Sequence, residues 1–198
     1  MVKLKLEIEG DKIKLRKLKL SDADNIYKNM SKEIVRWTIN IPWPYKKENA
    51  VKFIRKSNYR IKNKKEFVFG IVLKETDEVI GCVGLHKINW KNKNGEVGYW
   101  LGKKYWGKGL TSEAVSLMLR FAFKILKLHR VYAVVFEKNI ASRRVLEKNG
   151  FKLEGILREC SFRYGKWHNE LRFGILKEEY EKFIENKDKN NQNKSYSC

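Results

Sequence analysis

The sequence predicts an α/β (α+β) domain in which one mixed sheet carries helices on both faces. Segments typical of strands and of helices alternate along the 198 residues, and no linker-like stretch divides them. A chain of this length suits one compact domain, and a content of 42% hydrophobic residues is enough to bury a core. We therefore expect one domain over residues 1–180 and, over residues 181–198, a polar, flexible tail that frays beyond the last helix.

Hydrophobic periodicity places the elements within that domain. Alternating or continuous apolar segments predict strands over residues 12–18, 67–73, 79–89, 96–101, 131–136, 151–157 and 170–176. Apolar residues that repeat every three or four positions predict helices over residues 21–30, 46–61, 110–126, 140–149 and 177–186. Ser21 and Asp24 resemble a capping box that begins the first helix. Pro42 and Pro44 keep the segment before the second helix extended, and Gly150 ends the fourth.

A glycine-punctuated turn follows the strand over residues 96–101. Gly102, Gly107 and Gly109 separate this strand from the next helix. A strand that feeds a helix through such a loop turns several backbone N–H groups in one direction, which makes a site for phosphate oxygens. The spacing is not that of a Walker loop, since Lys108 is followed by Gly109, and it lacks the third glycine of a dinucleotide motif.

Two motifs, taken together, resemble a known family. The first, over residues 104–109, reads KYWGKG, a basic residue followed by x-x-G-x-G. The second, over residues 139–151, reads NIASRRVLEKNGF. In this order and spacing they resemble the GNAT superfamily of N-acetyltransferases, and within it the branch of ribosomal-protein N-terminal acetyltransferases.

The resemblance implies a fold and a cofactor site. It implies, over residues 10–180, a mostly antiparallel sheet that splays open between the strands over residues 96–101 and 131–136. Acetyl-CoA would lie in this opening, with its pantetheine arm against the first strand and its diphosphate on the glycine loop. The residues that would contact it are Trp100, Leu101, Lys104, Trp106, Gly107, Lys108, Gly109, Leu110, Thr111, Asn139 and Ser142. From the residues alone, Asn139 is equally an N-cap and Ser142 a first-turn side chain bonded to the backbone.

The resemblance also gives candidate catalytic residues, Glu96 and Ser142. Glu96 would accept a proton from the acceptor, because an α-amino group with a pKa of about 8 needs only a mild base; Glu66 is the second candidate. Ser142 or a water would protonate the departing thiolate, since Leu146 stands where many members of the superfamily have a tyrosine. A backbone N–H near Leu101 would stabilise the oxyanion. Each carboxylate is also typical of a surface residue at a strand end.

An aromatic, proline-containing segment resembles the acceptor groove of the ribosomal-protein branch. The candidate groove residues are Trp37, Trp43, Tyr45 and Glu66. The aromatic segment also fits a loop packed over the sheet without any contact to a substrate.

The bulk composition limits the other classes of function. The formal net charge is +21, from 44 Lys and Arg against 23 Asp and Glu, but the lysines are spread along the chain. We therefore expect no specific nucleic-acid site, although the charge favours an anionic ligand such as coenzyme A. No metal is implied by the scattered histidines, which lack ligand spacing. No apolar run is long enough for a membrane span or a signal segment, and three scattered cysteines are typical of reduced thiols, so we expect a cytoplasmic protein.

The sequence thus favours an enzyme that moves acetyl from acetyl-CoA to a primary amine by direct attack, with no covalent enzyme intermediate. The resemblance favours the α-amino group of a protein N-terminus, most readily a ribosomal one. A polyamine, an aminoglycoside or another small amine is the alternative acceptor. A non-catalytic acetyl-CoA-binding module and a basic nucleic-acid binder are the alternative classes, and a homodimer is implied only at the level of the family.

Overall fold

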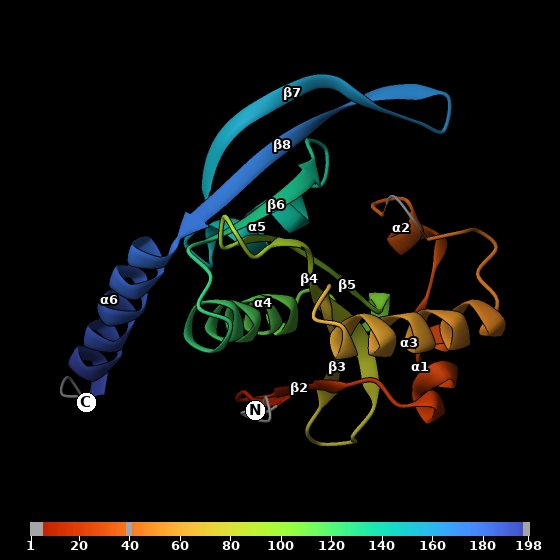
Figure 1. Ribbon diagram of the computed structural model, residues 1–198, viewed down its shortest axis with the longest axis horizontal. Helices are drawn as coiled ribbons and strands as arrows, with labels where there is room; N and C mark the ends of the chain where they lie inside the picture. The colour runs from red at the N-terminus through yellow and green to blue at the C-terminus, as the bar shows by residue number, and fades with distance from the viewer. Residues whose placement is uncertain (1–5, 39–40, 196–198) are drawn as a thin grey trace.

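A single mixed sheet runs through the molecule (Figure 1). The computed structural model describes residues 6–38 and 41–195. Its strands are β1 (Glu7–Glu9), β2 (Ile13–Lys17), β3 (Phe67–Leu73), β4 (Val79–Asn89), β5 (Asn94–Leu101), β6 (Arg130–Phe136), β7 (Lys152–Arg163) and β8 (Lys166–Leu176). They pair in the order β1-β2-β3-β4-β5-β6-β8-β7, and every pair is antiparallel except β5–β6, which is parallel. The predicted mixed, mostly antiparallel sheet is confirmed.

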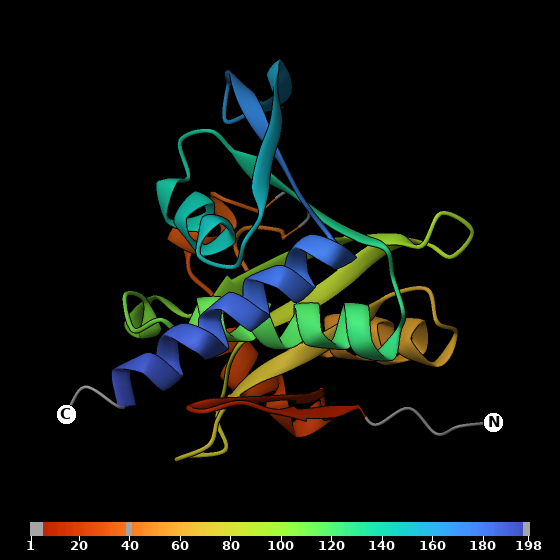
Figure 2. The same ribbon diagram turned by 90° about the vertical axis from the view of Figure 1, so that its left-hand side faces the viewer.

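Helices cover both faces of this sheet, as predicted (Figure 2). They are α1 (Ala23–Asn29), α2 (Lys32–Val35), α3 (Lys47–Lys62), α4 (Leu110–Arg120), α5 (Ile140–Glu147) and α6 (Lys177–Ser195). On one face, Ile26 of α1 and Ile54 of α3 share a buried cluster with Val68 of β3. On the other face, α4 packs on the central strands and α6 adds Tyr180 to the same cluster. We call these the α3 face and the α4 face.

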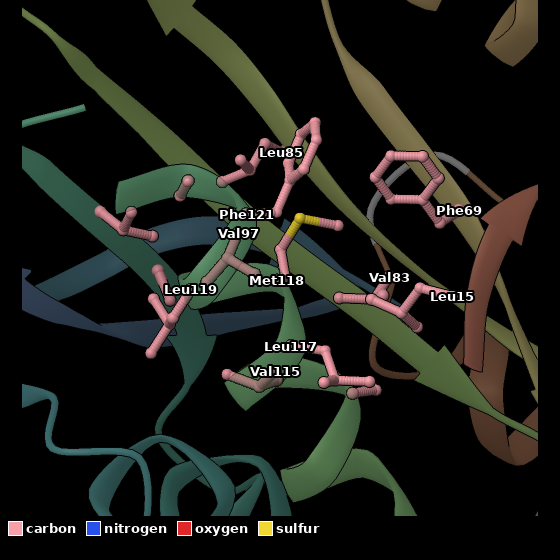
Figure 3. Close-up of a cluster of buried hydrophobic side chains, with 14 of the residues drawn as sticks. Leu15, Phe69, Val83, Leu85, Val97, Val115, Leu117, Met118, Leu119 and Phe121 are labelled. Carbon is pink, nitrogen blue, oxygen red and sulfur yellow. The ribbon is translucent and has the colours of Figure 1, made fainter. Parts of the chain in front are cut away.

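The main hydrophobic core lies between the sheet and α4 (Figure 3). Strands contribute Leu15, Phe69, Val83, Leu85 and Val97, while α4 and the turn after it contribute Val115, Leu117, Met118, Leu119 and Phe121. Because successive side chains of a strand point to opposite faces, burial of Val97 on the α4 face sends Glu96, Gly98 and Trp100 to the α3 face. Trp100 indeed packs against the cluster of α1 and α3.

β5 and β6 diverge part of the way along β5. Their paired residues are Asn94 with Arg130, Gly95 with Val131 and Glu96 with Tyr132. Beyond Glu96, β5 continues to Leu101 without a partner on that side, while β6 continues to Phe136 paired only with β8 on its other edge. The predicted opening between these two strands is confirmed.

The N-terminal elements differ from the prediction in detail. The sequence does not predict β1 or α2, because each is too short to show a periodicity. The predicted capping box of Ser21 and Asp24 is wrong, since Asp22 takes that part. The Asp22 carboxylate accepts the backbone N–H of Lys19 at 2.7 Å and two hydrogen bonds from Arg16, at 2.8 and 3.0 Å. Arg16 belongs to β2, so a local pattern could not reveal this buried ion pair.

The β7–β8 hairpin is longer than predicted. β7 runs to Arg163 and β8 starts at Lys166, and the hairpin rises clear of the helices (Figure 1). Its outer half exposes large side chains such as Phe162 and Trp167. The sequence pattern misses this part because no buried alternation marks it.

The C-terminal helix also continues beyond its predicted end at residue 186. α6 extends to Ser195, and no apolar stripe marks its last turns because residues 185–195 carry only polar and charged side chains. Residues 196–198, the last of the predicted tail, lie outside the described residues. Across the described residues, no helix combines the length and the apolar character needed to cross a membrane.

Candidate active site

The glycine loop before α4 takes a backbone conformation that requires glycine. Gly107 has φ of 76° and Gly109, the N-cap of α4, has φ of 79°. This left-handed region costs other L-residues roughly 1–2 kcal/mol. A Cβ added to either glycine would meet no atom within 4 Å. The space beside both glycines is therefore open, and their lack of a side chain keeps it so.

The amide hydrogens of this loop are available to a ligand. Within the described part of the chain, no protein acceptor meets the N–H groups of residues 107–112, and the first that is bonded is that of Glu113, to the Gly109 carbonyl at 3.1 Å. Consecutive free amides at a helix N-terminus bind anions because the helix dipole adds to their partial positive charge. The loop fits a diphosphate, which would use the backbone of Lys108 and Thr111 as well as that of the glycines.

Side chains tie the loop to the strands beside it. Trp106 donates its indole N–H to the Leu101 carbonyl at 2.7 Å, at the end of β5. The Tyr105 hydroxyl donates to Glu78 at 2.7 Å, and the Lys104 ammonium lies 3.3 Å from the same carboxylate. Burial would raise the pKa of Glu78, but the hydrogen bonds from Tyr105, Asn29 and Lys104 outweigh it and lower that pKa. Trp106 and Lys104, both predicted cofactor contacts, thus also fix the shape of the loop.

Several predicted cofactor contacts can offer only their backbone. Leu101 and Leu110 are both 4% exposed and belong to the core on the α4 face. The side chain of Trp100 packs on the opposite face, with Met30 and Tyr45. The end of β5 therefore presents main-chain groups, not these side chains, to the opening. The Trp100 indole points toward the α3 face.

The two predicted residues of α5 lie together at its start. The Asn139 side chain accepts the backbone N–H of Ser142 at 3.2 Å, so the N-cap predicted for Asn139 is confirmed. The hydroxyl oxygens of Ser142 and Tyr99 lie 2.8 Å apart, and the Tyr99 hydroxyl is also 3.2 Å from the Ser142 carbonyl. This contact links β5 to α5 where β5 has left β6. Burial raises the pKa of Tyr99 above its ordinary range, so the phenol is neutral at physiological pH.

Sequence reasoning missed Tyr99. The alternation of β5 could have indicated it, because Tyr99 shares the buried face of Val97 and Leu101, and a phenol on a buried face usually needs a hydrogen-bond partner.

A buried asparagine of the second sequence motif bonds to the helix that follows the first motif. The Asn149 side-chain amide donates to the Ser112 hydroxyl at 3.0 Å and to the Val145 carbonyl at 2.8 Å. It therefore connects the first turn of α4 to the last turn of α5. Leu146, which stands where the resemblance would place a tyrosine, is fully buried in the core.

The two candidate bases differ in their surroundings. Glu96 accepts a hydrogen bond from the Lys87 ammonium at 2.8 Å. Glu66 is bonded to the guanidinium of Arg60 and lies 3.3 Å from Nδ1 of His86. Burial would raise the pKa of Glu66, but the hydrogen bonds from His86 and Arg60 lower it to about 2. A carboxylate with so low a pKa is a poor proton acceptor near neutral pH.

The structure brings together only two of the four candidate groove residues. Trp43 and Tyr45 line a pocket of about 270 Å³ with Tyr27, Lys28 and Met30. Burial raises the pKa of Tyr45 to about 12. Trp37 and Glu66 are not in this pocket, and the Trp37 ring instead lies 5.0 Å from the guanidinium of Arg36.

A second pocket, which the sequence does not predict, lies between the β7–β8 hairpin and the turn after β6. It measures about 210 Å³ and is lined by Glu137, Lys138, Glu159, Trp167, His168 and Asn169. Asn169 orders its wall, because it donates to Glu137 at 2.9 Å and accepts the backbone N–H of Glu159 at 2.8 Å. In residues 6–38 and 41–195, no group of three or more His, Cys, Asp or Glu side chains could hold a metal ion.

Comparisons with known proteins agree with this geometry. A family model described as "Acetyltransferase (GNAT) domain" matches residues 12–152. The uncharacterized N-acetyltransferase p20 of Bacillus licheniformis is 35% identical over 170 residues, which cover 86% of this chain and 96% of the relative. The spermidine N(1)-acetyltransferase of Escherichia coli K12 is 31% identical over 103 residues, 52% of this chain and 55% of that protein.

Among solved structures, the ribosomal-protein-S5-alanine acetyltransferase of Vibrio fischeri is similar, with a TM-score of 0.78 and 25% sequence identity. The match covers 88% of this chain and 98% of that structure. Because the family model spans most of the chain and a relative aligns along nearly its whole length, this protein belongs to the GNAT family of acetyl-CoA-dependent N-acetyltransferases.

Proposed function

We propose that the acceptor of this N-acetyltransferase is the α-amino group of a protein N-terminus, most readily that of a ribosomal protein. The observation that carries the proposal is the pocket formed by Trp43, Tyr45 and their neighbours; the described residues that line it are aromatic side chains, one methionine and one lysine, with no carboxylate among them. Such a lining suits the small apolar or hydroxyl side chain of a first residue and disfavours a polycation. The similarity to a ribosomal-protein-alanine acetyltransferase supports the same acceptor.

The cofactor and the chemistry fit the opening of the sheet. The amides of residues 107–112 would hold the diphosphate, and the unpaired edge of β5 would bond the pantetheine arm. Bound acetyl-CoA supplies an activated thioester, so direct attack needs no covalent enzyme intermediate. The Tyr99–Ser142 hydroxyl pair would give a proton to the leaving thiolate, which has a pKa near 8.5 and needs little assistance.

A polyamine is the second candidate acceptor. The pocket between the hairpin and the turn after β6 carries two carboxylates, Glu137 and Glu159, beside the indole of Trp167. Carboxylates and an aromatic face together favour an organic ammonium group. The similarity to a spermidine acetyltransferase adds support for this alternative.

Acetyl transfer to a defined panel separates the two acceptors. The panel holds peptides with N-terminal alanine or serine, the same peptides with blocked N-termini, spermidine and an aminoglycoside. Thiol release and the mass of the product are measured for each. Acetylation of the free peptides only supports the proposal, whereas turnover of spermidine with none of the peptides would contradict it. The cytoplasmic location and the homodimer remain predictions.

A further inference from the structure

Ionisable side chains form a row across the α3 face at the level where β5 and β6 part. Glu66 comes just before Phe67 of β3, and His86 comes just after Leu85 of β4. Phe67 and Leu85 are paired, so Glu66 and His86 lie side by side. His86 is paired in turn with Glu96, and Glu96 with Tyr132, in the last pair before the opening. The row therefore ends at the edge of the opening between β5 and β6, where acetyl-CoA and the acceptor amine must meet.

The His86 ring leans from this row toward the opening. A Cβ added to Gly84 would lie 2.9 Å from Nε2 of His86, and one added to Gly98 would lie 3.4 Å from Cδ2 and 3.6 Å from Nε2. The imidazole thus covers two glycines that face each other across β4 and β5. Gly98 borders the opening, and its neighbour Tyr99 is bonded to Ser142. Nε2 of His86 is therefore placed beside the unpaired part of β5.

The groups around His86 fix which nitrogen can take a proton. The Glu66 carboxylate lies 3.3 Å from Nδ1, and Arg60 of α3 holds that carboxylate from the other side. Nδ1 is therefore the proton donor of the neutral ring, and Nε2 keeps its lone pair. On the opposite side, Glu96 faces the ring but is neutralised by Lys87. Beyond that pair lie Tyr132 and Arg172, and Arg172 in turn donates to Glu170 at 2.8 Å.

We propose that His86 is the general base of acetyl transfer and that Glu66 is its positioning residue. The inference rests on the proposed function, because it needs an amine acceptor. Nε2 takes a proton from the acceptor ammonium, and the free amine nitrogen then forms its bond to the acetyl carbon. The carbon–sulfur bond breaks as the Tyr99–Ser142 hydroxyl pair protonates the thiolate, and the second amine proton passes to that pair and restores it. Glu96, paired with Lys87, takes no proton.

A pH profile of His86→Gln tests the base. The variant can use only amine that is already deprotonated in solution, so the acidic limb of kcat/KM should move up to the pKa of the amine, about 8. With an N-terminal alanine peptide as acceptor, we expect a loss of about 30-fold at pH 6.5 and less than about 3-fold at pH 9, because roughly one amine in thirty is free at pH 6.5. His129→Gln, at an exposed histidine outside the site, is the control and should match the wild type. An equal loss at every pH overturns the proposal.

Two glycine variants test the place of the ring. Gly84→Ala puts a methyl group 2.9 Å from Nε2 and should reproduce the pH profile of His86→Gln, while Gly98→Ala meets only ordinary contacts and should not. Because the Gly84 methyl group also comes within 2.9 Å of Val68, thermal melts must show that the variant is folded. Identical profiles of the two folded variants overturn the proposal.

NMR and hydrolysis separate this inference from the choice of acceptor. Nitrogen-15 spectra should show the His86 Nδ1–H tautomer in the wild type and its loss in Glu66→Gln; a wild-type Nε2–H tautomer overturns the proposal. If no amine of the panel is acetylated, the proposed acceptor is wrong. The slow hydrolysis of acetyl-CoA then tests whether His86 is a general base. Water then replaces the amine, so thiol release slower in His86→Gln than in His129→Gln supports the base, and equal rates refute it.

Discussion

The most specific prediction concerns the glycine loop. Glycine is required there for two separable reasons, the backbone conformation and the open space beside it. Gly107→Val forces a β-branched residue to φ of 76° and fills space that is empty to 4 Å. The first effect lowers the free energy of unfolding by at least about 1–2 kcal/mol. The second displaces a diphosphate oxygen from the amides. A hydrogen bond to a charged group is worth about 1.5–3 kcal/mol, so the Kd for coenzyme A should rise about 10- to 150-fold for each bond lost.

Gly165, in the turn of the β7–β8 hairpin, offers a matched control. Its φ is 72° and an added Cβ would also meet no atom within 4 Å. Gly165→Val therefore carries the same backbone strain without touching the loop. Urea denaturation should show a similar destabilisation in both variants. Isothermal titration with coenzyme A should show weaker binding in Gly107→Val alone.

The comparison of these two variants can refute the diphosphate site. If both variants bind coenzyme A as the wild type does, the amides of residues 107–112 do not hold the diphosphate. If both bind it equally weakly, the loss at Gly107 reflects strain rather than contact. Only weaker binding of coenzyme A in Gly107→Val alone agrees with a diphosphate held by the free amides of the loop.

Three further changes test the surroundings of the opening. Tyr99→Phe removes the hydroxyl bonded to Ser142, and this hydrogen bond is worth about 1 kcal/mol. Steady-state kinetics should therefore show kcat about 5-fold lower and an unchanged KM for acetyl-CoA. A change in KM alone contradicts a role of Tyr99 in protonating the leaving thiolate. Asn139→Ala removes the N-cap of α5 and should lower the free energy of unfolding in urea by about 1 kcal/mol; no change would show that the cap is redundant. The folded pKa of Glu66, about 2, lies below its ordinary 4.5, so the ionised carboxylate stabilises the fold above pH 4.5, and this contribution is lost as the pH falls toward 2. Glu66→Gln should therefore be up to about 3 kcal/mol less stable at pH 7, with a difference that shrinks below pH 4.5 in urea melts; a constant difference contradicts the shift.

The features that sequence predicts best depend on local backbone chemistry. Gly107 and Gly109 are predicted in a phosphate-type loop because few other residues accept left-handed backbone, and both do adopt it. Asn139 is predicted as an N-cap from its place between a strand and a helix, and its side chain bonds the N–H of Ser142. In each case the deciding interaction spans only a few residues, so it can be identified from the sequence alone.

The features that sequence does not predict join elements far apart in the chain. Tyr99 meets Ser142 only because β5 leaves β6 at the level where α5 begins. The predicted capping box of Ser21 and Asp24 is wrong for the same reason, because the Asp22 carboxylate bonds Arg16 on β2 as well as capping its own helix. Such contacts depend on register and on packing, and no single segment carries a signal for them.

The row of ionisable groups shows how much depends on strand register. Cys82, Gly84 and His86 alternate along β4, so they share the α3 face with Glu66 only because Phe67 pairs with Leu85. A slip of one residue would turn His86 to the α4 face, into the core. Just after His86 the pairing with β5 shifts, and Lys87 has φ of 48°, which lets it neutralise Glu96 from the same face. The irregularity next to His86 therefore brings Lys87 to Glu96, while the regular register beside it keeps the imidazole on the α3 face.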